Sequence, residues 1–151
     1  MKYVDALYFK KNNRSTDIVY LNSNKTINKT IEKLLNELCL ENLSTLNGRI
    51  NAVKERYNIH KFIPIYISDE LILLPIYPKD YYTQIYLNIN LVKNIQQELN
   101  KTKIIFNEEK YIIVDAPYLR IKQYVEKCKR IKNDQLIKSQ ERIYITWQRK
   151  T

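Results

Sequence analysis

Six basic side chains are the residues of this sequence best suited to bind a ligand. They are Arg49, Arg56, Lys61, Lys122, Lys129 and Arg130. The first two stand seven residues apart on the flank of a segment whose apolar residues follow helical spacing. Lys and Arg bind phosphate oxygens and release the counterions condensed around nucleic acids. We therefore expect these six residues to face an anionic partner, with nucleic acid as the first candidate.

The distribution of charge along the chain also favours an anionic partner. The 151 residues carry a formal net charge of +10. Residues 1–60 contain 10 basic and 6 acidic groups (+4), residues 61–117 contain 6 and 7 (−1), and residues 118–151 contain 10 and 3 (+7). A nearly neutral middle between two basic ends indicates a scaffold flanked by basic surfaces, and such asymmetry is typical of proteins that bind polyanions.

Two other functions fit part of the same pattern. A basic protein associated with RNA or with a larger assembly would need no base preference, and tyrosines could stack on unpaired bases. A metal-dependent nuclease is the enzymatic alternative, because Glu108-Glu109-Lys110 together with Asp80 could hold a metal beside a lysine. The triplet falls at the tip of a predicted hairpin, however, where three charged residues ordinarily form a solvated turn.

The remaining reactive residue types predict no catalytic site, metal or cofactor. The single glycine, Gly48, excludes the glycine-rich loops that bind phosphates in nucleotide-binding folds. His60 is the only imidazole, and no nucleophile motif lies near it in the sequence. Cys39 and Cys128 lack metal-ligand spacing, so we expect both to be reduced, buried thiols. We therefore expect a protein that is not an enzyme.

A sheet is predicted from the middle of the sequence. The strand-like segments are 2–9, 17–22, 62–68, 71–77, 84–89, 103–106 and 111–114. The runs at 62–68 and 71–77 are rich in β-branched and aromatic residues and predict a buried hairpin. Pro64 and Pro75 must then lie at an edge or a bulge. Residues 91–95 predict a turn or a short helix.

Helical spacing predicts the elements that carry the basic residues. Helices are expected over residues 30–39 and 46–57, and a third from about residue 117, where a proline suits the first turn. The basic tail at 133–151 is either a second helix or a fraying end. The expected fold is a single α+β domain with a mostly antiparallel sheet centred on 62–114, a short helix before it and a basic amphipathic C-terminal helix.

The apolar content of the chain does not suggest a membrane partner. No stretch approaches the ~20 unbroken apolar residues of a membrane span. The first residues lack the apolar run of a signal peptide. We expect a cytoplasmic protein.

Several short motifs follow one another in a fixed order from about residue 38 to residue 123. They are Cys39, the helix-opening Leu46-Asn47-Gly48-Arg49, the strand Ile63-Pro64-Ile65, the strand end Leu74-Pro75-Ile76, the strand Ile85-Tyr86-Leu87-Asn88 and, in the final helix, Gln123. In this order the chain resembles the ComK family of competence transcription factors of low-GC Gram-positive bacteria. Leu74 and Ile76 replace the usual Phe and Thr, Tyr86 replaces a Trp, and residues 1–30 match poorly. The chain thus resembles a divergent member.

The resemblance implies a sequence-specific, DNA-binding activator of DNA-uptake genes. Such a protein binds AT-rich A-run/T-run boxes in double-stranded DNA, largely through the minor groove, as a homodimer or tetramer. The narrow minor groove of A-tracts attracts Arg and Lys, which agrees with the six basic candidates. The resemblance also implies RNA polymerase and a Clp-protease adaptor as partners.

Overall fold

A six-stranded antiparallel sheet forms the centre of the protein in the computed structural model, which describes residues 2–77 and 84–150. Its strands, in spatial order, are β3 (Asn24–Ile27), β2 (Thr16–Val19), β1 (Tyr8–Lys11), β6 (Ile85–Asn88), β5 (Leu71–Ile76) and β4 (Ile65–Ser68). The predicted central hairpin is confirmed, because β4 and β5 pair antiparallel with a register shift between Tyr66 and Ser68. Every residue of β5 is buried, as its unbroken apolar sequence predicts.

Both prolines of this region lie where a strand can accept them. Pro64 immediately precedes β4. Pro75 lies opposite Tyr86 of β6, but the pairing of β5 with β4 ends at Leu73. Pro75 therefore has a paired strand on one side only, and its missing N–H leaves no gap in the β4–β5 ladder.

The N-terminal strands differ from those predicted and belong to the same sheet. Residues 2–5 form a turn and β1 begins at Tyr8, so the prediction of a strand over 2–9 is wrong for residues 2–7. β3 was not predicted, because it is a polar edge strand in which three of four residues are exposed. The predicted α+β class with a mostly antiparallel sheet is confirmed. The strands within 62–114 divide between two sheets, however, and β1 joins the larger one by pairing with β6 through Phe9 and Tyr86.

A second, three-stranded sheet lies apart from the first. It consists of β7 (Asn94–Glu98), β8 (Lys101–Ile105) and β9 (Tyr111–Val114), all antiparallel. The predicted hairpin at its centre is confirmed as β8 and β9. The turn or short helix predicted at 91–95 is in fact a single 3-10 turn, η1 (Ile89–Leu91), followed by β7. β7 was not predicted because four of its five residues are polar and exposed.

Three helices complete the α+β fold. They are α1 (Ile31–Glu41), α2 (Leu46–Tyr57) and α3 (Tyr118–Lys150). The helices predicted at 30–39 and 46–57 are confirmed, and the side-chain oxygens of Thr30 and Thr45 each accept a backbone hydrogen bond from the first turn. α3 is one continuous helix of 33 residues, where the sequence had left a second helix or a fraying tail open.

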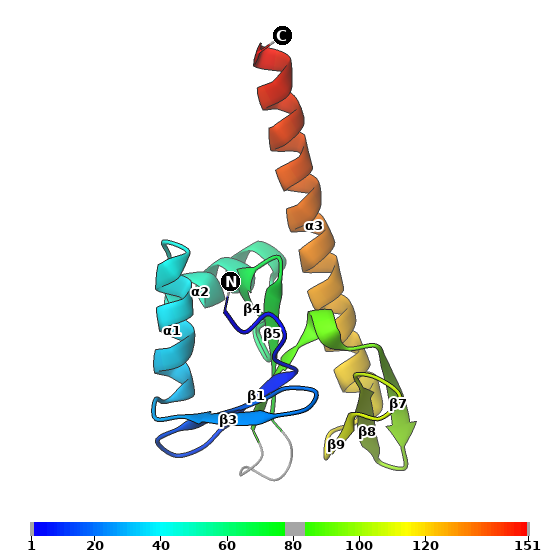
Figure 1. Cartoon of the computed structure of the whole chain (residues 1–151). Coiled ribbons are helices and arrows are strands. Elements are labelled where there is room, and N and C mark those ends of the chain that lie inside the picture. The colour runs from blue at the N-terminus through cyan, green and yellow to red at the C-terminus, as the bar shows by residue number, and fades with distance from the viewer. Residues whose placement is uncertain (1, 78–83, 151) are drawn as a thin grey trace.

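The layers of the molecule follow from the alternation of side chains along β5. Leu73 belongs to a buried cluster with Leu35 of α1, whereas the adjacent Leu74 belongs to a second cluster with Cys128 of α3. The central sheet therefore separates α1 from α3 and the small sheet, as Figure 1 shows. The first half of α3 packs on these sheets, and its C-terminal end extends beyond them (Figure 1).

Candidate nucleic-acid interface

The start of α2 is held by short-range contacts that fix where its arginines lie. Thr45 accepts a hydrogen bond from the Gly48 N–H at 3.0 Å, and the Leu46 N–H donates to the Asn36 side chain of α1 at 2.9 Å. A Cβ atom on Gly48 would lie 2.9 Å from the same Thr45 oxygen. Gly48 has no positive φ. The lone glycine therefore permits the close approach of the capping Thr45 hydroxyl, and it is not needed for a left-handed backbone conformation.

Two adjoining depressions between α2 and α3 form what we call the α2–α3 crevice. The lining of the first, of about 160 Å³, includes Arg49, Val53, Arg56, Tyr66 and Gln135. The lining of the second, of about 300 Å³, includes Asn58, Ile59, Lys127, Arg130 and Asp134. Tyr57 and Ile131 line both depressions, so the two adjoin each other at these side chains. Three predicted site residues line the crevice, Arg49 and Arg56 of α2 in the first depression and Arg130 of α3 in the second.

A hydrogen-bonded group that we call the Tyr57 clamp holds the two helices together. The Tyr57 hydroxyl donates to the Asp134 carboxylate at 2.5 Å and accepts from the Gln135 side-chain amide at 2.8 Å. Lys138 pairs with the same carboxylate at 3.3 Å. Burial, followed by the hydrogen bond to Asp134, raises the pKa of Tyr57, and the hydrogen bond from Tyr57 lowers the pKa of Asp134. At neutral pH the clamp therefore has a protonated donor and an ionised acceptor.

The charge of the crevice is predominantly positive. Its basic residues are Arg49, Arg56, Lys127 and Arg130. Among the described residues that line it, Asp134 is the one carboxylate, and this group is already engaged by the clamp and by Lys138. The Nε–H of Arg49 donates a hydrogen bond to Ser44 Oγ at 2.8 Å. This bond uses one of the five N–H donors of the guanidinium and orients the group. The arrangement can bind phosphate or a narrow electronegative groove.

The other three predicted site residues do not line the crevice. Lys61 is exposed in the connection between α2 and β4. Lys122 and Lys129 are exposed on α3, and at about 100° per residue both lie roughly a quarter of a turn from Arg130. The structure adds Lys127, which the sequence had not marked as a site residue. Its spacing of three residues from Arg130, which places both on one helix flank, was the available signal.

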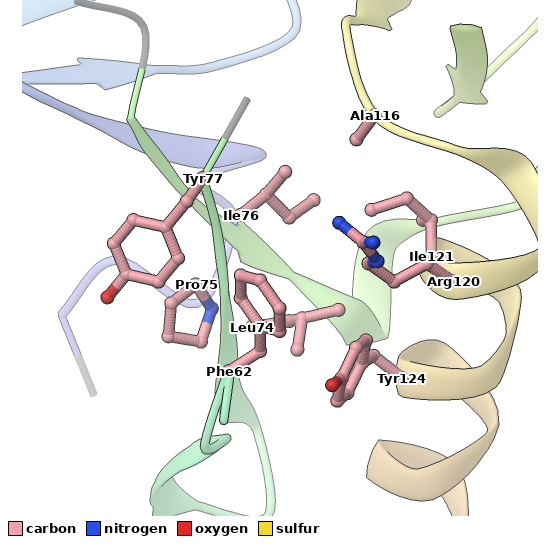
Figure 2. A pocket seen from close by; sticks show the side chains of 9 residues that line it. All are labelled: Phe62, Leu74, Pro75, Ile76, Tyr77, Ala116, Arg120, Ile121 and Tyr124. Carbon is pink, nitrogen blue, oxygen red and sulfur yellow. The ribbon is translucent and has the colours of Figure 1, made fainter. Parts of the chain in front are cut away.

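A third depression separates β5 from the start of α3 and is filled by aromatic side chains. Figure 2 shows Phe62 between Pro75 and Tyr124, with the Arg120 guanidinium at one side. The Phe62 ring lies 4.9 Å from the ring of Tyr124 and 5.4 Å from that of Tyr77. Only about 10 Å³ of space remains, which is close to the volume that one water needs. This contact packs α3 on the sheet and offers no room for a ligand.

The residues considered for catalysis form no metal-binding cluster within the described parts of the chain. Glu108 and Glu109 lie in the β8–β9 turn, as predicted, and Asp80 lies outside the described residues. No group of three or more His, Cys, Asp or Glu side chains in the described parts of the chain could hold a metal ion. His60 is exposed, with Nε2 2.8 Å from Asn58 Oδ1.

Both cysteines are buried free thiols, as predicted. Desolvation raises the pKa of Cys39, and it raises that of Cys128 to about 12. Such thiols stay protonated and are poor nucleophiles. No helix in the described residues combines the length and the apolar character that crossing a bilayer requires.

The fold and the crevice define a small, basic α+β protein with a positively charged surface between two helices. The family model described as ComK protein matches residues 3–140, and the chain therefore belongs to the ComK family. This is a family of transcription factors that govern competence. The match includes residues 3–30, within the N-terminal segment that the sequence motifs matched poorly. No curated protein and no solved structure matches the chain.

Proposed function

We propose that this protein is a sequence-specific DNA-binding activator that reads AT-rich promoter boxes through the α2–α3 crevice. The observation that carries the proposal is that arginines from segments far apart in sequence line two adjoining depressions, Arg49 and Arg56 the first and Arg130 the second. The six basic residues predicted from the sequence then fall into two groups. Three of them and Lys127 border the crevice, and the others supply charge around it.

The chemistry of the crevice suits the minor groove of A-tracts. That groove is narrow and strongly electronegative, and it attracts basic side chains that insert into it. The planar guanidinium of arginine suits such insertion better than the ammonium point charge of lysine. Readout in this groove distinguishes A·T from G·C pairs without resolving their order. A crevice with arginines from two helices, held at fixed spacing by the Tyr57 clamp, supports this mode of binding.

The proposal is tested by fluorescence anisotropy at fixed salt with two duplexes of equal length. One duplex carries paired A-run and T-run boxes and the other is GC-rich. Arg56→Ala should weaken binding to the first duplex and reduce the slope of log affinity against log salt by about 1. Arg14→Ala is the matched control, because Arg14 is exposed in the β1–β2 loop, away from the crevice.

Each part of the proposal can fail separately. Equal affinities for the two duplexes would remove sequence specificity and favour the alternative of a basic RNA-associated or assembly protein. A minor-groove ligand that fails to compete would remove the groove assignment alone. Equal effects of the Arg56 and Arg14 substitutions would place the DNA-binding face elsewhere.

The remaining partners are those that family membership suggests. Association into a homodimer or tetramer, contact with RNA polymerase and recognition by a Clp-protease adaptor belong to the same proposal, as does a cytoplasmic location. Paired DNA boxes require two binding faces at a fixed distance, so self-association has a direct role in this function. Size measurement of the protein in solution tests this part without DNA.

A further inference from the structure

The C-terminal half of α3 presents an exposed apolar surface. Every residue from 141 to 149 is exposed, and this part of the helix extends past both sheets (Figure 1). Side chains at helical spacing on it are Leu136, Ile137, Gln140, Ile143, Tyr144 and Trp147, which we call the distal stripe. At about 100° per residue these six lie within an arc of about 120°. The family match ends at residue 140, inside the stripe.

Charged residues avoid the distal stripe. Between residues 134 and 149 they are Asp134, Lys138, Glu141, Arg142 and Arg149. At about 100° per residue all five fall on the opposite side of the helix. This segregation is the pattern of an amphipathic helix that buries its apolar side against another element.

The sheets of the same chain cannot supply that element. Ile121, Cys128 and Ile131 form the side of α3 that is buried on the body of the protein. The centre of the distal stripe is turned from that side by roughly a third of a turn. The stripe is therefore not a continuation of the docked face, and from Ile137 onward all of its side chains are exposed.

We propose that two copies of this chain associate through the distal stripe, each covering the stripe of the other. Ile137, Ile143, Tyr144 and Trp147 are 54%, 69%, 60% and 62% exposed. At ~200 Å² for a large apolar side chain they expose on the order of 500 Å² per chain. Two copies would bury about 1,000 Å², which reaches the lower bound for a specific interface.

Gln140 argues for a second copy over an unrelated protein as the occupant. It lies in the middle of the stripe and is the one polar residue within it. An amide carries both donors and an acceptor, so two Gln140 side chains that face each other across a two-fold axis satisfy one another. A single polar residue within an apolar helix pair commonly fixes its register. The pairing adds a surface to the self-association proposed above, and its test uses no DNA.

The test compares two isoleucines on opposite sides of one helix. Ile143 lies in the stripe and Ile145 lies among the charged residues, and both are exposed. In analytical ultracentrifugation over a dilution series, wild type should dimerise, Ile143→Glu should weaken the dimer at least roughly tenfold, and Ile145→Glu should leave it unchanged. Circular dichroism checks that both variants keep the helix. A wild type that is monomeric throughout, or equal weakening by the two variants, would overturn the proposal.

Cross-linking tests whether the two Gln140 residues meet. Cys39 and Cys128 are buried, so the wild-type chain should give no disulfide-linked dimer under mild oxidation. Gln140→Cys should form one efficiently, whereas Lys138→Cys, on the charged side of the helix, should not. Equal yields from the two variants, or no product from either, would contradict the pairing.

Discussion

The two halves of α3 use similar residues for different purposes. In the first half, isoleucine, valine and cysteine side chains at helical spacing are buried against the two sheets. In the second half, isoleucine, tyrosine and tryptophan side chains at the same spacing are exposed, on a different side of the helix. The comparison teaches that apolar periodicity predicts a face to be buried but does not tell which molecule buries it. Position in the fold decides this, because Ile131 is the last buried residue of α3 and every residue from 141 to 149 is exposed.

The same substitution in the two halves of α3 should have different effects on the free energy of unfolding. Ile131 is 2% exposed and Ile143 is 69% exposed. Ile131→Ala should lower the free energy of unfolding by about 3 kcal/mol, because it removes buried methyl groups and leaves a cavity. Ile143→Ala should change it by less than about 0.5 kcal/mol in dilute solution, where the helix end is exposed. Urea unfolding followed by circular dichroism measures both. Similar losses for the two variants would mean that the distal half is part of the folded core.

The dependence on salt concentration should differ between DNA binding at the α2–α3 crevice and self-association through the distal stripe. If the four basic residues of the crevice each neutralise a phosphate, affinity for the A-run duplex should fall about 100-fold between about 50 and 200 mM salt. Self-association through an uncharged stripe should change only slightly over the same range, because apolar burial does not release condensed ions. Anisotropy with DNA and ultracentrifugation without it give the two slopes. A dimer that dissociates as steeply with salt as the DNA complex would show that charged residues hold it.

Much of the fold could be predicted because several segments bury one continuous side. The run at 71–77 is apolar throughout and became the fully buried β5, and the helical spacing at 46–57 became α2. The two strands that were missed, β3 and β7, are mostly polar and exposed, and each packs a single isoleucine, Ile27 or Ile95, on the core, which is too little to form a pattern. The length of α3 was left open because its apolar residues move to a different side of the helix after Ile131. The apolar periodicity expected for one continuous face therefore weakens at that point.

The candidate site was predicted in part for a similar reason. Arg49 and Arg56 could be placed on one flank because seven residues make two turns of the same helix. That Arg130 would join them, and Lys122 and Lys129 would not, depends on how α3 crosses α2. The Tyr57–Asp134 contact that sets this crossing joins residues 77 positions apart, a distance over which local pattern carries no information.

The smallest expected effect concerns the Tyr57 clamp, at the boundary between the two halves of α3. Tyr57→Phe removes the hydrogen bond to Asp134 while keeping the ring between the helices. The melting temperature should fall by about 2–4 °C at neutral pH. Tyr20→Phe, on another half-buried tyrosine, serves as control. Dimer affinity through the distal stripe should not change, whereas DNA affinity should fall, because only the crevice depends on the spacing of α2 and α3.

The difference in melting temperature between wild type and Tyr57→Phe should depend on pH through the ionisation of Asp134. The Asp134 pKa is lowered in the folded protein from its ordinary value of 3.8, chiefly by the hydrogen bond from Tyr57. A group of this kind stabilises the fold fully above its unfolded pKa and ceases to do so as pH falls through its folded pKa. The difference in melting temperature between wild type and Tyr57→Phe should therefore be constant from about pH 5 to 8 and shrink below about pH 4. A difference that persists undiminished at low pH would mean that Tyr57 holds the helices through packing and not through the carboxylate.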